Sequence, residues 1–325
     1  MKGTAAAIAV AALSFCAGAV GGAHAQSFPT KPIRLIVPYP AGGATDALLR
    51  PVAISLAQKL GTQVIVDNRG GGATLIGAGI AAKAPADGYT LLSCGNATHA
   101  ISPQLYRHAA YDPFKDFTPV TLVASSPTVL FGHLKLPAST VSELVDAAKA
   151  NPGKFSYASS GAGTPPHLSA EIFMAMAGIK LLQVPYKGGG DSLADLVAGR
   201  VDMKFGSAPE AIPPVKAGRL KGIAIALETR WPDLPNMPTF AESGWPKYRT
   251  GTWYGLCAPA KTPPGVINAL YTATRDALAS SELRDRLRNL GAVPGGISPR
   301  EFAAFIRAEY DSYGKIIKAL DLRPD

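Results

Sequence analysis

The sequence has few cysteines and histidines, and beyond residue 25 it has no long apolar run. Without such a run, no segment past that point has the length of a membrane-spanning helix. The 325 residues carry a net charge of +9, but the basic residues are scattered, with no Lys/Arg run and no stripe of alternating basic and aromatic residues. This scatter argues against a nucleic-acid partner. A basic excess instead favours small anions, which are drawn in by long-range attraction.

The motifs of several enzyme classes are also missing. Gly72 to Gly77 has the glycine spacing of a phosphate-binding loop, but no Lys and Ser/Thr follow it. Ser159-Ser160-Gly161 lacks the leading glycine of a hydrolase nucleophile elbow. The histidines beyond residue 25 show no metal-ligand spacing; they are His99, His108, His133 and His167. We therefore predict a binding protein rather than an enzyme, with no metal and no cofactor.

The first 25 residues indicate export. Lys2 gives a short basic start, Ala5 to Val20 is almost wholly apolar or small, and Ala23-His24-Ala25 is an A-x-A cleavage site. This is the pattern of a secretory signal peptide, residues 1–25, cleaved before Gln26. We expect the mature chain to be exported as a soluble protein.

Two cysteines remain in the mature chain, Cys94 and Cys257. An oxidising compartment permits a disulfide between them. Both lie in apolar, strand-like runs, however, and buried free cysteine is common in such places. A disulfide between them is kept as the alternative, but we interpret the pair as two free thiols.

One unit occurs twice in the chain: an apolar strand, a glycine-rich turn and a helix. Ile33 to Val37 runs into the turn Pro40 to Asp46, and Phe155 to Ala158 runs into the turn Ser159 to His167. A helix N-terminus presents unpaired backbone N–H groups and the positive end of the helix dipole. Glycines there remove the side chains that would keep a ligand away. Two such turns, in separate halves of the chain, predict a small anion held from both sides.

Short β-branched runs alternate with helical patterns from Gln26 onward, which predicts an α/β fold with largely parallel sheets. A third junction, Gly95 to His99, follows the strand Tyr89 to Leu92 and is placed to join the first turn around one site. Ser298-Pro299-Arg300-Glu301 is a capping box, which predicts a last helix to about Leu320. Thr164, with Pro165 after it, predicts another helix that has Thr164 as its N-cap.

We expect two lobes with the chain crossing between them twice. Lobe 1 takes residues 26–124 and 251–325, and lobe 2 takes residues 125–250. Two crossings form a hinge, and the cleft between the lobes is the expected ligand site.

Five blocks of sequence also carry a family resemblance: Pro32 to Asp46, Asp87 to Leu92, Tyr111 to Phe117, Ser159 to Thr164 with His167-Leu168, and Val184 to Gly188. Together they resemble the Bug-type solute receptors of the tripartite tricarboxylate transporter family. The resemblance implies the two-lobe type II (Venus flytrap) fold of periplasmic binding proteins, with two hinge crossings. It also implies that the chain closes on a small carboxylate and delivers it to membrane permease subunits. We expect a monomer.

In that family the carboxylate is held mainly by backbone N–H groups, short hydroxyl side chains and bridging water. The resemblance therefore implies the following ligand-binding residues: Tyr39, Ala41, Gly42, Gly43, Ala44, Thr45, Asp46, Asn96, Thr98, Ser160, Gly161, Gly163, Thr164, His167 and Ser207. Asp46 has a second interpretation, as an acceptor of N–H bonds that shapes the first helical turn.

The identity of the carboxylate is left open by the sequence. Gly206-Ser207 stands where many family members have an Asp-Asn pair, so the substrate cannot be copied from a relative. Dicarboxylates, tricarboxylates, aromatic acids and amino acids all remain possible, because backbone donors recognise the carboxylate and not the rest of the molecule.

Two other functions share parts of this pattern. A sensory receptor that signals a bound carboxylate to a membrane partner uses the same binding chemistry and differs only in its partner. An exported hydrolase using Ser160 and His167 is a more distant alternative, because no complete nucleophile motif surrounds Ser160.

Overall fold

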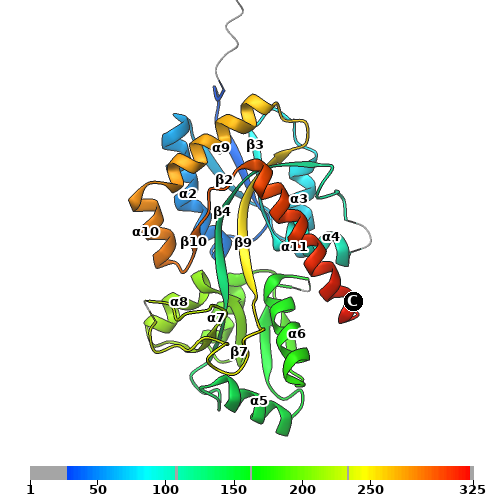
Figure 1. Ribbon diagram of the computed structural model, residues 1–325, viewed down its shortest axis with the longest axis vertical. Helices are drawn as coiled ribbons and strands as arrows, with labels where there is room; N and C mark the ends of the chain where they lie inside the picture. Colours follow the sequence, from blue (N-terminus) through cyan, green and yellow to red (C-terminus); the bar gives the residue numbers. More distant parts are fainter. Residues whose placement is uncertain (1–27, 107–108, 162, 233, 323–325) are drawn as a thin grey trace, which may run out of the picture.

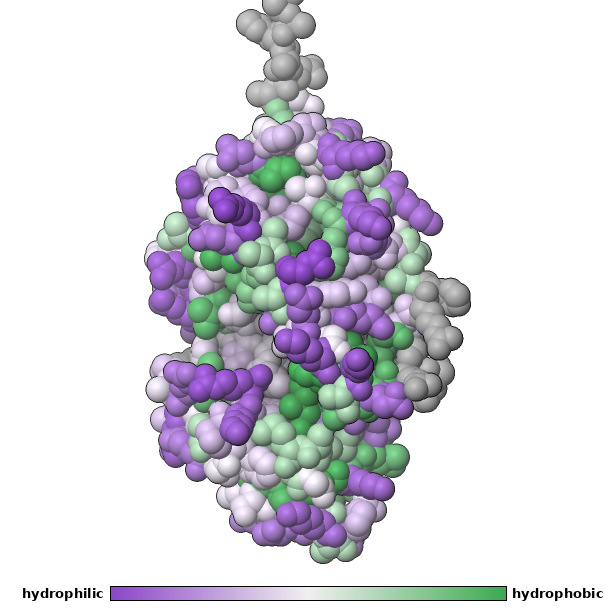
Figure 2. Space-filling model, turned by 45° about the vertical axis from the view of Figure 1, so that its right-hand side comes forward, coloured by the Kyte–Doolittle hydropathy of each residue, from purple (hydrophilic) through white to green (hydrophobic). Residues whose placement is uncertain are grey.

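The computed structural model describes residues 28–106, 109–161, 163–232 and 234–322 of the chain. The expected signal peptide, residues 1–25, lies outside them. Two α/β lobes are stacked along the longest axis of the molecule, and two long strands run from one lobe into the other (Figure 1). Figure 2 shows the surface hollowed at the waist between the lobes.

The strands β4 (Phe117–Gly132) and β9 (Gly251–Pro259) connect the two lobes. β4 pairs antiparallel with β9 as far as Pro127, and from Thr128 onward it pairs with β7 (Met203–Ser207) of lobe 2. The chain therefore passes between lobes within one strand rather than in a loop.

Lobe 1 contains a sheet with a parallel and an antiparallel part. β1 (Ile33–Val37) lies between β2 (Val64–Asn68) and β3 (Thr90–Gly95), parallel to both, and β3 pairs antiparallel with β9. The short β10 (Val293–Pro294) pairs with β4. The helical elements of this lobe are α2 (Ala44–Leu60), η1 (Gly72–Thr74), α3 (Leu75–Ala82), η2 (Ala97–Ile101), α4 (Ser102–Leu105), α9 (Pro264–Leu278), α10 (Ser281–Asn289) and α11 (Pro299–Ala319).

Lobe 2 has its own parallel strands. β5 (Ser156–Ser159) lies between β6 (Leu182–Pro185) and β7, and β8 (Lys221–Ile225) pairs antiparallel with β4. The main strand order through both lobes is β2-β1-β3-β9-β4-β7-β5-β6. The helices of this lobe are α5 (Val141–Ala150), α6 (Pro165–Ala177), α7 (Gly189–Val197) and α8 (Ala208–Lys216). Among the described residues, no helix combines the length and apolar character that crossing a bilayer requires.

Several helices begin where the sequence predicts. Ser298 caps α11 in a complete capping box: its hydroxyl accepts the N–H of Glu301, and the Glu301 carboxylate accepts the Ser298 N–H at 2.9 Å. Thr164 is the N-cap of α6, with Pro165 as the first helical residue. These helix starts are confirmed. The turns that precede α2 and α6 lie at the boundary between the lobes.

The interpretation of Cys94 and Cys257 as free thiols is wrong, because the two residues form a disulfide. Cys94 lies on β3 and Cys257 on β9, strands that pair side by side, and the two Cα atoms are 5.9 Å apart. A separation of 163 residues along the chain hides this proximity from any local pattern. The disulfide ties β9 to the N-terminal part of the lobe 1 sheet.

Candidate functional site

Four helix N-termini meet at one cavity between the lobes. Its empty volume is about 460 Å³, part of which is open to solvent. The positive ends of the four helix dipoles thus face the same space, an arrangement that suits an anion. Lobe 1 and lobe 2 both line the cavity, with Tyr39, Gly43, Ala44, Thr45, Thr252 and Tyr254 from the first and Ser160, Thr164, Pro165, Pro166, Gly189, Ser207 and Glu210 from the second.

The start of α2 supplies the donor groups on the lobe 1 side. Its N-cap, Gly43, has no side chain that could accept a hydrogen bond, so the first-turn N–H groups have no capping partner. Ala44 and Thr45 follow directly, and both line the cavity. A carboxylate placed here meets backbone N–H groups and the Thr45 hydroxyl.

Asp46 supports this turn without lining the cavity. Its carboxylate accepts the Gly42 N–H at 3.0 Å, the Arg50 guanidinium at 2.9 Å and the Asn68 amide at 3.0 Å. Burial raises the pKa of Asp46, but these hydrogen bonds outweigh it and hold the pKa below its usual range. The contacts match the interpretation of Asp46 as the acceptor that shapes the turn.

The start of α6 offers fewer donors than its glycine turn suggests. Pro165 and Pro166 have no N–H, which removes two of the first-turn donor groups. The Thr164 hydroxyl does not cap the helix but donates back to the carbonyl of Gly161 at 2.7 Å. On this side of the cavity, the hydroxyl of Ser160 is therefore a more direct donor than the α6 backbone.

The N-terminus of α7, rather than that of α6, lies opposite the N-terminus of α2. A Cβ built on Gly43 of lobe 1 would lie 3.7 Å from the backbone N of Gly189, so the α2 and α7 N-termini face each other at van der Waals distance. The N-cap of α7, Gly188, has no side chain either. The two uncapped helix starts thus close on the cavity from opposite lobes.

Two tyrosines complete the wall on the lobe 1 side. Tyr39 and Tyr254 both line the cavity, and Tyr254 shares a hydrogen bond with Ser207 across the lobe boundary. Burial raises the pKa of both phenols well above the usual range, and Tyr254 adds to the shift of Tyr39. Both hydroxyls therefore stay protonated and are able to donate a hydrogen bond to an anion.

The third predicted junction lies at a smaller adjoining cavity. Asn96 and Thr98 line it together with Tyr39 and Thr45, so the first and third junctions do meet. The side chain of Asn96 accepts the backbone N–H of Trp253 at 2.8 Å, and the Thr98 hydroxyl bonds within its own loop. These two residues brace the wall behind the site.

The remaining residues that the resemblance implied line neither cavity. Gly163 lies at the lobe boundary with φ of +74°, and a Cβ there would lie 2.6 Å from Cδ2 of Leu105 in lobe 1. A glycine at this position allows the lobes to approach each other. The residues outside the two cavities are Ala41, Gly42, Asp46, Gly161, Gly163 and His167.

The contacts of His167 bear on the hydrolase alternative. Its Nδ1 accepts the backbone N–H of Gly163 at 3.1 Å, and its Nε2 lies 3.6 Å from the carboxylate of Glu171. Both ring nitrogens therefore have partners other than Ser160. These contacts do not form the serine–histidine pair that the hydrolase alternative requires.

Sequence reasoning missed six of the lining residues: Pro165, Pro166, Gly189, Glu210, Thr252 and Tyr254. For α7 a signal was present, because Gly188-Gly189-Gly190 ahead of a helix repeats the pattern of the other two turns. For Glu210 no local signal exists, since an acidic residue in a first helical turn is ordinary.

One cluster of potential metal ligands lies behind the site. Cys94, Cys257 and His99 bring their ligand atoms within 4.8 Å of one another. The two sulfurs are bonded to each other, however, and metals bind the thiolate form. Burial lowers the pKa of His99 to about 3, so its ring is neutral. With the disulfide in place this cluster supplies one neutral imidazole and no thiolate.

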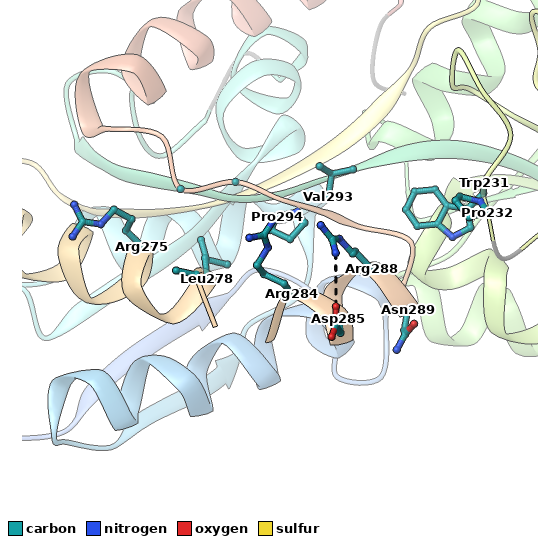
Figure 3. Close-up of a pocket in the computed structure, with 13 residues that line it drawn as sticks. Trp231, Pro232, Arg275, Leu278, Arg284, Asp285, Arg288, Asn289, Val293 and Pro294 are labelled. Atoms are coloured by element: carbon teal, nitrogen blue, oxygen red, sulfur yellow. Dashed lines mark ion pairs between the residues drawn. The ribbon is translucent and has the colours of Figure 1, made fainter. Parts of the chain in front are cut away.

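A second, wider groove lies outside the cavity, between α10 and the lobe 2 segment that contains Trp231. Figure 3 shows Arg284 and Arg288 extending from α10 toward β10, with Arg288 paired to Asp285 at 3.7 Å. Arg275 also lines the groove, and its guanidinium forms an ion pair with Asp276 at 2.9 Å. The groove is basic and solvent-open, and no helix N-termini gather in it.

Comparison with known proteins agrees with this geometry. The family model described as "Tripartite tricarboxylate transporter family receptor" matches residues 48–322. The protein BugT of Bordetella pertussis is 33% identical over 303 residues, which cover 93% of each chain.

Solved structures with the same fold include two that hold a carboxylate. Rpa4515 of R. palustris with adipate is 37% identical, with a TM-score of 0.89 over 92% of this chain and 100% of that one. MatC from Rhodopseudomonas palustris with bound malate is 30% identical, with a TM-score of 0.85 over 89% of this chain and 100% of that one.

Proposed function

The chain belongs to the tripartite tricarboxylate transporter receptor family, as its five sequence blocks predict, and from this premise we propose how it works. It is a periplasmic receptor that captures a small carboxylate between its lobes and hands it to the permease subunits of a membrane transporter. The type II fold of periplasmic binding proteins is confirmed by solved structures of periplasmic relatives. Cleavage before Gln26 and a monomeric state are part of the proposal.

One observation carries it: uncapped helix N-termini from both lobes converge on a single cavity. Thr45 and the α2 backbone hold the carboxylate from lobe 1, and Ser160 and the α7 start hold it from lobe 2. The protonated phenols of Tyr39 and Tyr254 add donors. The adipate and malate of the two solved relatives are ligands of this chemical class.

The affinity that such a site provides is sufficient for a receptor. A hydrogen bond to a charged group contributes about 1.5–3 kcal/mol. Micromolar binding requires about 8 kcal/mol, so a handful of donors reaches it after ordering costs, provided that closure excludes water. No arginine is required in the cavity.

The lobes close by bending where β4 changes partner. Lobe 1 comprises residues 26–124 and 251–325, and lobe 2 comprises residues 125–250. Pro127 is the last residue of β4 opposite β9, and Thr128 is the first opposite β7, which supports these boundaries.

Ligand screening tests the proposal directly. Thermal unfolding of the mature chain is measured with dicarboxylates, tricarboxylates, aromatic acids and amino acids in turn. A ligand at one hundred times its Kd stabilises the folded state by about 2.7 kcal/mol. If no carboxylate raises the melting temperature, the proposed function is wrong.

Two further readouts separate the alternatives. Recovery of the bound acid unchanged after long incubation supports binding without turnover, whereas product formation supports the hydrolase. Deletion of the gene abolishes uptake of the ligand if the chain serves a transporter. It abolishes only induction of downstream genes if the chain is a sensor.

A further inference from the structure

A buried ion pair lies at the wall of the cavity, and the site described above gives it no role. Lys204 on β7 is 0% exposed, and its ammonium donates to the carboxylate of Glu210 in the first turn of α8. Burying two charges is costly, and replacement of such pairs by apolar residues is often neutral or stabilising. The pair therefore calls for a functional explanation.

The Lys204 ammonium is enclosed by lobe 2. It donates to the Ser192 hydroxyl at 2.6 Å as well as to Glu210, and Ser192 in turn donates to the carbonyl of Gly189 at 2.8 Å. Lys204 does not line the cavity, whereas Glu210 does. A ligand in the cavity is therefore next to Glu210, whereas Lys204 lies behind it and out of the ligand's reach.

Two glycines leave room for that carboxylate. A Cβ on Gly189 would lie 3.0 Å from Oε1 of Glu210, and a Cβ on Gly206 would lie 2.7 Å from Oε2. Gly189 is also the residue that faces Gly43 across the cleft. The carboxylate of Glu210 therefore lies next to Gly189, the residue of lobe 2 that faces lobe 1 at this point.

We propose that Glu210 is the specificity residue of this site and selects a carboxylic acid that carries a hydrogen-bond donor, a hydroxyl or ammonium group, away from its carboxylate. The inference rests on the proposed function. A charged carboxylate only accepts hydrogen bonds, so the ligand group beside it must donate. A second ligand carboxylate at that place would meet a like charge. Unsubstituted dicarboxylates are therefore disfavoured, although relatives bind adipate and malate.

Calorimetric titration with matched ligands tests this. Two series keep one carboxylate and change the other end: succinate, 4-hydroxybutyrate and 4-aminobutyrate, and adipate, 6-hydroxyhexanoate and 6-aminohexanoate. We expect a hydroxy or amino acid to bind more tightly than the dicarboxylate of its length. Whichever of the hydroxy acid and the amino acid binds more tightly identifies the donor group, a hydroxyl or an ammonium.

Glu210→Gln then separates charge from shape. We expect it to weaken the preferred hydroxy or amino acid about ten- to hundredfold, the worth of a hydrogen bond to a charged group, and to strengthen the matching dicarboxylate. Asp285→Asn, in the exposed groove of Figure 3, makes the same change in net charge outside the cavity and leaves every affinity unchanged.

Folding of the variant is checked by its melting temperature, because Glu210→Gln leaves Lys204 buried beside a neutral partner. If that variant does not fold, the double variant Lys204→Met/Glu210→Gln removes both charges and must give the same reversal of preference. A wild-type preference for the dicarboxylate in both series, or an unchanged preference in the folded variant, overturns the assignment of Glu210. Failure of every acid to bind the wild type instead overturns the proposed function.

Discussion

Pro40 of lobe 1 packs against Gly188 of lobe 2 so closely that a Cβ on Gly188 would lie 2.9 Å from both Cδ and Cγ of Pro40. Gly188 has an extended backbone that any residue adopts, with φ of −173°. An added methyl group therefore strains the contact between the lobes and not the fold of lobe 2.

Gly188→Ala is accordingly expected to resist closure. We predict at least a tenfold loss of carboxylate affinity with little change in melting temperature of the free protein, measured by calorimetry and thermal unfolding. Gly265→Ala is the matched control, because nothing lies within 4 Å of a Cβ at that position on α9. Equal affinities of the two variants would show that the Pro40–Gly188 contact between the lobes is not needed for ligand binding.

The N-cap of α2 gives a second prediction. A Cβ on Gly43 meets Gly189 N at 3.7 Å, an ordinary contact, so Gly43→Ala fits. Gly43→Val adds two methyl groups over the donor N–H groups, and we expect it to abolish binding while the chain still folds. Normal binding by Gly43→Val, with Gly265→Val as the control for helix propensity, would show that the carboxylate lies elsewhere.

The disulfide predicts redox-dependent stability. Loss of the Cys94–Cys257 bond is expected to lower the free energy of unfolding by about 2–4 kcal/mol, since the bond closes a long loop. Urea unfolding with and without reductant measures this, and Cys94→Ala/Cys257→Ala is the control that reductant must not affect. A wild-type curve that reductant leaves unchanged would favour free thiols.

Asp46 predicts a dependence of stability on pH. Its folded-state pKa is lowered, so its contribution is present above the unfolded carboxyl pKa and is lost as the pH falls through the folded pKa. Asp46→Asn should therefore lower the free energy of unfolding at pH 7 by on the order of 1 kcal/mol, the size of a hydrogen-bond contribution, and by less at pH 3. The measurement is urea unfolding at both pH values, with the exposed Asp285→Asn as control. A cost that is equal at both pH values would mean that the charge of Asp46 does not matter.

Local features of the sequence predicted much of this architecture. The glycine turn before Ala44 and the Thr164-Pro165 start define helix starts through backbone preferences, and the Ser298 capping box defines one through hydrogen bonds between neighbouring residues. Such local signals are visible in a short stretch of sequence.

What escaped prediction depends on contacts between distant segments. The cysteine pair requires knowing that β3 and β9 are neighbours. The place of Gly189 requires knowing that α7 faces α2 across the cleft. The place of Glu210 requires knowing that the two lobes meet at the cavity and that Lys204, six residues earlier on β7, is buried beside it.

The passage of β4 from one lobe into the other has a mechanical consequence. A flexible loop would let the lobes swing in many directions, whereas a strand bonded to β9 on one side of Pro127 and to β7 beyond it must change its twist over several residues. We therefore expect the lobes to open and close along a narrow range of directions. Each binding event would then bring the same residues of the two lobes back into contact.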